Sequence, residues 1–264
     1  MPEMTAWQAQ GDVIVNFKGT MKIIAIANQK GGTAKTTTTA ALGVLLSRNG
    51  IPVHLVDMDP QASLSRAFGR TDPAARLYHS FASRASLPVD TLAPNLTLSP
   101  SSIELARTET ELLTEPGREY FLRTCMERTQ LPENAVVLLD CPPSLGILVV
   151  NCLATAGGLL TVVQPGGFEL HAMVHLQVTV RIIQERIRPD LCVLGAIITN
   201  AHRRRVITNQ VAFEVGRVSP VLGVVRADAR LLYATTAGKI LELSRSKALD
   251  DYAAVVNRLQ DGIL

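Results

Sequence analysis

Residues 28–38 combine the residue types that bind phosphate, in the order Asn-Gln-Lys-Gly-Gly-Thr-Ala-Lys-Thr-Thr-Thr. They follow the apolar run 23–27, so the pattern predicts a strand that enters a loop and then a helix. In a phosphate-binding loop, backbone N–H groups surround the phosphate oxygens, a lysine reaches the terminal phosphates and a hydroxyl group binds Mg²⁺. Lys35 and Thr36 have the residue types and the order that the last two tasks require. The loop therefore predicts a site for a nucleoside triphosphate.

The same loop departs from the generic G-x-x-x-x-G-K-[ST] spacing at both glycine positions, which are occupied by Gln29 and Ala34. If position 34 requires a positive φ, an alanine there costs about 1 kcal/mol relative to glycine. A cost of that size is too small to abolish nucleotide binding. We therefore expect the loop to retain ATP binding despite both substitutions.

Acidic side chains follow two other apolar runs. Asp57 and Asp59 come directly after the run 53–56, and Asp140 follows the run 135–139. Acids two positions apart in an extended segment point to the same side, about 7 Å from each other. One carboxylate of such a pair can position the water that attacks a phosphate, and another can hold Mg²⁺ through its water shell. Two carboxylates that cap a loop are the alternative interpretation.

Apolar strands that alternate with longer helical segments must position these residues. The predicted strands are 22–28, 52–57, 135–140, 159–164, 192–199 and 221–225, and the predicted helices are 35–48, 102–113, 117–129, 169–187, 206–215 and 247–260. This pattern predicts a doubly wound α/β fold, in which helices cover both faces of a mostly parallel twisted sheet. Ligands of such folds bind at the carboxyl ends of the strands.

One domain is expected over residues 21–264, preceded by residues 1–20, which we interpret as a mobile N-terminal extension. We expect the segment 71–100 to form loops and a short helix, because it is rich in Pro, Ser and Ala. The apolar stretch 145–163 is interrupted by Asn151 and a pair of glycines. It is therefore interpreted as a helix that ends near Ala156 and a buried strand, and not as a membrane span.

The motif Lys30-Gly-Gly-x-x-Lys35-Thr-Thr resembles the deviant Walker A loop of the ParA/MinD ATPases. The D-x-D-P-Q segment at Asp57 and the D-x-P-P-S-L-G run at Asp140 resemble the other nucleotide motifs of the ParA branch, and the resemblance extends over about residues 21–260. It implies a slow, partner-stimulated ATPase that uses ATP and Mg²⁺ and forms a homodimer with ATP. In that family the early lysine, here Lys30, reaches the partner subunit's nucleotide.

The resemblance also assigns roles to individual residues. Catalytic roles fall to Lys30, Lys35 and Asp59, of which Asp59 positions the attacking water. The expected nucleotide contacts are Lys30, Gly31, Gly32, Thr33, Ala34, Lys35, Thr36 and Thr37, with Asn200 and Asp228 as candidate adenine contacts. The expected Mg²⁺ ligands are Thr36 and Asp140, and Asp57 supports the metal through water.

Basic residues predict a DNA-binding surface. Aromatic residues make up only 4% of the chain, which argues against a surface that stacks on bases, so any DNA contact is expected to be to the phosphate backbone. The resemblance places DNA contacts near residues 202–205 and 230. The candidates are Arg203, Arg204, Arg205, Arg226, Arg230, Lys239, Arg245 and Lys247.

The expected function is segregation of chromosome or plasmid DNA in the cytoplasm at the nucleoid, with release from DNA stimulated by a ParB-like partner. A ParA-like ATPase that positions a protein cargo is an open alternative. A membrane-associated MinD-like ATPase is disfavoured, because the tail 252–264 has few bulky apolar residues. An iron–sulfur carrier is disfavoured because the four cysteines show no C-x-x-C spacing, and we expect them to be reduced, mostly buried thiols.

Overall fold

The apolar runs of the sequence form the strands of one sheet. In the computed structural model, which describes residues 21–166, 169–202 and 206–262, the strands are β1 (Lys22–Ala27), β2 (Val53–Asp57), β3 (Asp90–Ala93), β4 (Leu96–Ser99), β5 (Val136–Asp140), β6 (Gly158–Val163), β7 (Cys192–Ala201) and β8 (Val221–Arg226). Their spatial order is β3-β4-β2-β5-β1-β6-β7-β8, and all neighbours are parallel except β3 and β4. The predicted mostly parallel sheet is confirmed.

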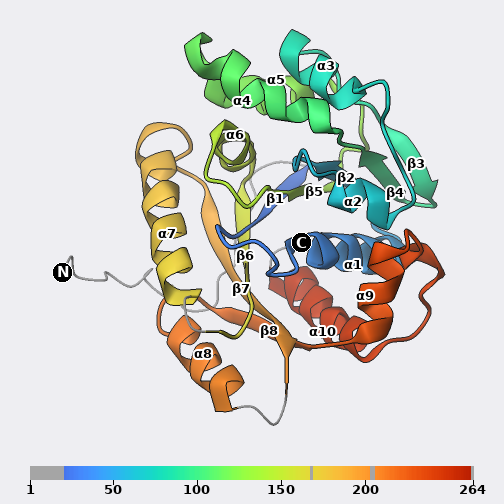
Figure 1. Ribbon diagram of the computed structural model, residues 1–264, viewed down its shortest axis with the longest axis vertical. Coiled ribbons are helices and arrows are strands. Elements are labelled where there is room, and N and C mark those ends of the chain that lie inside the picture. Colours follow the sequence, from blue (N-terminus) through green and yellow to red (C-terminus); the bar gives the residue numbers. More distant parts are fainter. Residues whose placement is uncertain (1–20, 167–168, 203–205, 263–264) are drawn as a thin grey trace.

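Helices cover both faces of this sheet, as expected for buried parallel strands. The α-helices are α1 (Lys35–Arg48), α2 (Ser63–Ala67), α3 (Arg76–Ser83), α4 (Thr108–Glu111), α5 (Phe121–Arg128), α6 (Ile147–Thr155), α7 (Glu169–Arg186), α8 (Val206–Gly216), α9 (Ala229–Thr236) and α10 (Lys247–Gly262). Figure 1 shows α1, α9 and α10 together on one side, with α3, α4 and α5 on the other. The predicted extension at 1–20 lies outside the described residues.

Alternating side chains of the central strand β1 contribute to two separate apolar cores. Ile24 and Ile26 belong to the core formed with α1, α9 and α10, whereas Ala25 and Ala27 belong to the core formed with α5, α6 and α7. This alternation follows from the two-residue period of a strand. Burial on both faces fixes the register of β1, so the loop that follows it leaves the sheet at a defined point.

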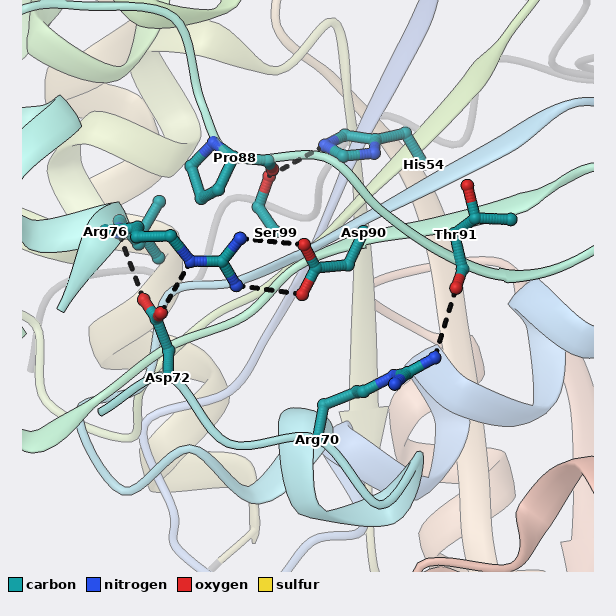
Figure 2. A network of polar contacts seen from close by, with 9 residues as sticks. His54, Arg70, Asp72, Arg76, Pro88, Asp90, Thr91 and Ser99 are labelled. Atoms are coloured by element: carbon teal, nitrogen blue, oxygen red, sulfur yellow. Dashed lines mark hydrogen bonds and ion pairs between the residues drawn. The ribbon is translucent and has the colours of Figure 1, made fainter. Parts of the chain in front are cut away.

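The prediction of loops and a short helix for 71–100 was partly wrong. The short helix is α3, but β3 and β4 form an antiparallel hairpin at the edge of the sheet, and Asn95 in its turn has a φ of 58°. Figure 2 shows how Arg76 at the start of α3 holds the hairpin, with contacts of 2.7 Å to Asp72 and 2.8 Å to Asp90. The pair with Asp72 has the i,i+4 spacing of a helix, but the pair with Asp90 connects residues that no sequence period relates.

Two predicted helices are interrupted in the structure. The range 102–113 contains the 3-10 helix η1 (Ile103–Arg107), then α4 and the beginning of a second 3-10 turn, η2 (Leu112–Thr114). The range 117–129 contains η3 (Arg118–Tyr120) before α5. The helix α9 was not predicted. By contrast, α1 has the predicted bounds and α6 ends one residue before Ala156.

The cysteines are free thiols, with Cys192 half-buried and the other three buried, as the sequence predicts. Among the described residues, no helix combines the length and the apolar character needed to cross a membrane.

Candidate nucleotide-binding site

A cavity of about 470 Å³ lies at the carboxyl ends of the central strands. The loop 31–37 forms one wall, and Asp59, Ser63 and Arg66 form another. The strand ends contribute Thr199, Asn200, Val225, Arg226 and Asp228, and the remaining wall consists of Pro143, Tyr252 and the α9 residues Leu231, Leu232, Thr235 and Thr236. The cavity therefore joins the predicted phosphate loop to the predicted adenine contacts in one continuous space.

The phosphate loop has the backbone conformation that anion binding requires. Gly32 and Ala34 both have positive φ values, 74° and 67°, and Ala34 is the residue directly before α1. Position 34 thus has the positive φ at which alanine is less favourable than glycine. The helix N-terminus that follows offers unpaired N–H groups and a partial positive charge to the cavity.

Lys35 lies buried at the base of this loop, and its Nζ atom donates a hydrogen bond to the carbonyl oxygen of Lys30 at 3.2 Å. Burial lowers the pKa of the Lys35 ammonium, and the nearby Asp140 opposes that effect. Lys30 itself is exposed and does not line the cavity. The structure thus separates the two lysines, with Lys35 buried at the cavity and Lys30 exposed outside it.

Two polar side chains that sequence reasoning missed fix the loop to neighbouring strands. Asn28 donates to the carbonyl of Val162 at 2.6 Å and accepts from the Lys30 N–H at 3.2 Å. Thr199 donates to the carbonyl of Thr33 at 2.8 Å. Both side chains are buried, so these bonds hold the loop against β6 and β7. A polar residue at the end of an apolar run was the only signal in the sequence.

The carboxylates Asp57 and Asp140 lie side by side at the ends of β2 and β5, where their Cα positions are paired in register. Both side chains are almost completely buried. Burial raises the pKa of each carboxyl group, and the negative charge of Asp57 raises that of Asp140 further. Lys35 lowers the pKa of Asp140 only in part, and among the described residues no salt bridge reaches either acid, so the two buried acids favour a further cation in their vicinity.

The hydroxyl group of Thr36 connects this pair to the cavity, because it donates to Asp140 Oδ2 at 2.8 Å, while Thr39 donates to Asp140 Oδ1 at 3.1 Å. A hydroxyl oxygen and a carboxylate oxygen so close together fit Mg²⁺, which takes few protein ligands and keeps waters or phosphate oxygens as the others. In the described part of the chain no cluster of three or more His, Cys, Asp or Glu could hold a metal by itself. The arrangement therefore fits a metal that is bound jointly with phosphate.

Asp57 also closes the loop between β2 and α2. Its Oδ2 atom accepts from the N–H of Ser65 at 2.8 Å and from the Ser65 hydroxyl at 2.7 Å, and its Oδ1 atom accepts from the Asp59 N–H at 3.3 Å. Asp59 in turn accepts from the Gln61 N–H at 2.9 Å. Both acids therefore cap the loop, as the alternative interpretation predicts, and Asp59 also lies at the cavity wall.

The two candidate adenine contacts differ in the groups they can offer. Asn200 is exposed near the end of β7 with a φ of 50°, and it lines the cavity. Asp228 borders the cavity too, but its carboxylate accepts from the N–H groups of Arg230 and Leu231 and caps α9. Asp228 therefore has a structural role, because it caps the helix that forms one wall of the cavity.

The basic candidates for DNA binding separate into two groups. Arg226 forms a two-pronged ion pair with Asp251, with both contacts at 2.7 Å, so its charge is already matched. Four others are exposed between the start of α9 and the start of α10, and they are Arg230, Lys239, Arg245 and Lys247. Lys239 is 4.0 Å from Glu242, a loose and solvent-exposed contact. Arg203, Arg204 and Arg205 lie outside the described residues.

Comparison with known proteins places these features in a family. Residues 21–193 match the family described as "AAA domain". The chain is 34% identical to the sporulation initiation inhibitor protein Soj of Bacillus subtilis over 242 residues, which cover 88% of this chain and 95% of Soj. The chain belongs to the Soj/ParA family. It is also 36% identical to the chromosome partitioning protein ParA of Caulobacter vibrioides over 202 residues, covering 74% of this chain and 75% of that protein.

A solved structure supports the same fold for this Soj/ParA chain. Cobyrinic acid a,c-diamide synthase from Mycobacterium smegmatis, with bound ADP and magnesium, superposes with a TM-score of 0.77 at 29% identity. The match covers 90% of this chain and 93% of that one. The fold is therefore one in which a related protein holds a nucleotide together with magnesium.

Proposed function

We propose that this Soj/ParA-family protein is an ATPase that uses ATP and Mg²⁺ to segregate chromosome or plasmid DNA. The observation that carries the proposal is the Thr36–Asp140 contact of 2.8 Å beside the phosphate loop, in a chain of this family. Lys35, Thr36 and Asp140 would hold the phosphates and the metal, and Mg²⁺ would neutralise phosphate charge there. Residues 21–264 would form the ATPase domain.

In this proposal Asp59 is the residue that positions the attacking water. Its carboxylate already accepts one backbone N–H, from Gln61, and keeps lone pairs that can accept from water. Asp57 lies beneath it, buried and held by Ser65, which suits a carboxylate that acts on the metal site through water. The loop 31–37 supplies N–H groups that orient the phosphate chain during the transfer.

We further propose that ATP binding favours a homodimer in which Lys30 contacts the partner subunit's nucleotide. The exposed position of Lys30 outside the cavity supports an action on a second chain. Arg230, Lys239, Arg245 and Lys247, together with Arg203, Arg204 and Arg205, would then bind DNA phosphates in the nucleoid without reading bases. A ParB-like partner would stimulate hydrolysis and so end DNA binding.

The decisive experiment measures DNA binding against salt concentration with ATP, with ADP and without nucleotide. We expect binding only with ATP, a steep loss of affinity as salt rises, and an ATP-dependent shift from monomer to dimer in light scattering. The variant Lys30→Ala should still bind ATP but should remain a monomer. Equal DNA binding without nucleotide would refute the proposed switch.

A further inference from the structure

The cavity is lined by three cationic side chains of the described residues: Lys35, Arg66 and Arg226. The sequence motif accounts for Lys35. Arg226 is neutralised by Asp251, as described above. Arg66, in the α2 helix, is not part of any nucleotide motif that the sequence predicted, and it is the cation at this cavity that still needs an explanation.

Within the described part of the chain, the Arg66 side chain donates hydrogen bonds to uncharged acceptors only. Its guanidinium group donates to the carbonyl oxygen of Gln61 and to the Ser63 hydroxyl, the latter at 3.2 Å. No carboxylate of the described residues forms an ion pair with it. Arg66 is exposed and lines the cavity, so its positive charge lies within reach of a ligand that enters it.

The backbone beneath Arg66 is held firmly even though the side chain is exposed. Its carbonyl oxygen lies 2.9 Å from the position that a Cβ atom at Gly238 would take, so α2 packs closely on the turn after α9. Its N–H donates to the Ala62 carbonyl at 3.0 Å. A fixed backbone and a long side chain let the guanidinium group change partners without moving the cavity wall.

The two acceptors of Arg66 belong to the turn that presents Asp59. Gln61, whose carbonyl accepts from Arg66, also donates its N–H to Asp59 Oδ1 at 2.9 Å. The guanidinium group is therefore close to the end of the cavity where the attacking water is proposed to sit. That end is where the terminal phosphate of a nucleoside triphosphate belongs, because water attacks that phosphate.

We propose that Arg66 binds the terminal phosphate of the nucleoside triphosphate held by its own chain. On binding, the guanidinium group exchanges two hydrogen bonds to neutral oxygens for stronger, charge-assisted bonds to phosphate, a ligand that its planar array of donors fits well. The proposal rests on the proposed ATP site. It adds a triphosphate-selective contact that comes from the α2 helix and not from the phosphate loop or a partner.

The test compares ATP and ADP affinities of Arg66→Gln, Arg66→Lys and the wild type by isothermal titration calorimetry. Arg48→Gln is the matched control, because Arg48 is also an exposed arginine that donates two hydrogen bonds to neutral carbonyls, those of Leu241 and Leu243, away from the cavity. We expect Arg66→Gln to weaken ATP binding about tenfold or more and ADP binding less than about twofold. Arg66→Lys should lie between Arg66→Gln and the wild type.

Unchanged ATP affinity in Arg66→Gln, or an equal loss for ATP and ADP, would overturn the assignment to the terminal phosphate. Thermal unfolding of each variant without nucleotide shows whether folding is preserved. Lys35→Ala separates this inference from the proposed function: if Lys35→Ala abolishes ATP binding and Arg66→Gln leaves it intact, only the role of Arg66 fails. If the wild type binds no ATP, the proposed function itself fails.

Discussion

Replacing Ala34, the N-cap residue of α1, by glycine should stabilise the protein, although glycine usually destabilises the interior of a helix. Ala34 has φ 67° and ψ 29°. In this left-handed conformation a Cβ atom costs about 1–2 kcal/mol through its contact with the following carbonyl group. Glycine removes that cost but gives the unfolded chain more freedom, which offsets about 0.5–1 kcal/mol. The net expectation for Ala34→Gly is a gain of about 0.5–1 kcal/mol, or about 1–4 °C in melting temperature.

Urea unfolding without nucleotide measures this gain, and two other alanines provide controls. Ala75 precedes α3 with a φ of 50° and lies outside the cavity, but its methyl group is buried in the core, so Ala75→Gly should give a smaller gain without any change in ATP affinity. Ala40 is fully buried within α1, and Ala40→Gly should lower the unfolding free energy by about 1 kcal/mol. A loss of stability in Ala34→Gly comparable to that in Ala40→Gly would refute the reasoning from backbone strain.

Variants at three further positions test other buried polar groups. Burial lowers the pKa of His54 to about 4, so between pH 4 and 6.5 the unfolded chain binds more protons than the folded chain. As pH falls through that range, the unfolding free energy of the wild type relative to that of His54→Gln should decrease by about 3 kcal/mol. A difference in urea unfolding that does not change with pH would contradict this. Ser65→Ala removes a donor to Asp57 and the acceptor, at 2.9 Å, of the Ser101 N–H, so it should cost about 1–3 kcal/mol in urea unfolding, and Ser65→Thr should recover part of the loss. Asp140→Asn removes a carboxyl group whose pKa is raised by burial, so in alkaline buffer without metal the variant should melt at a higher temperature than the wild type. The same variant should lose ATP hydrolysis in a phosphate-release assay.

The parts of the fold that the sequence predicted are those set by local pattern. The strands β1, β2 and β5 are short apolar runs buried on both faces, so composition alone identifies them. The carboxyl ends of these parallel strands meet at one edge of the sheet, which brings the phosphate loop, Asp57 and Asp140 together as expected. Spacing along the chain was sufficient because Asp57 and Asp140 are the last residues of their strands and the phosphate loop follows β1.

The parts that were missed depend on contacts between distant residues. β3 and β4 have only four residues each, and their pairing is supported by the ion pair of Arg76 with Asp90 (Figure 2). The α9 helix begins at the Asp228 cap, but its exposed Leu232 and Tyr233 break the expected apolar stripe. Neither the hairpin nor the α9 helix has a hydrophobic period in the sequence that would predict it.

Four charged side chains at or near the cavity, Asp57, Asp140, Lys35 and Arg66, form hydrogen bonds to neutral groups, whereas Arg226 is paired with Asp251. Asp57 and Asp140 accept hydrogen bonds from hydroxyl and backbone N–H groups, while Lys35 and Arg66 donate to backbone carbonyls or a hydroxyl. Such partners offset the cost of burial only in part, which agrees with the raised pKa values of both acids and the lowered pKa of Lys35. A triphosphate with its metal ion would supply opposite charges to both sets at once. Nucleotide binding should therefore stabilise this chain strongly, and the proposed homodimer would recognise a phosphate loop that ATP has stabilised.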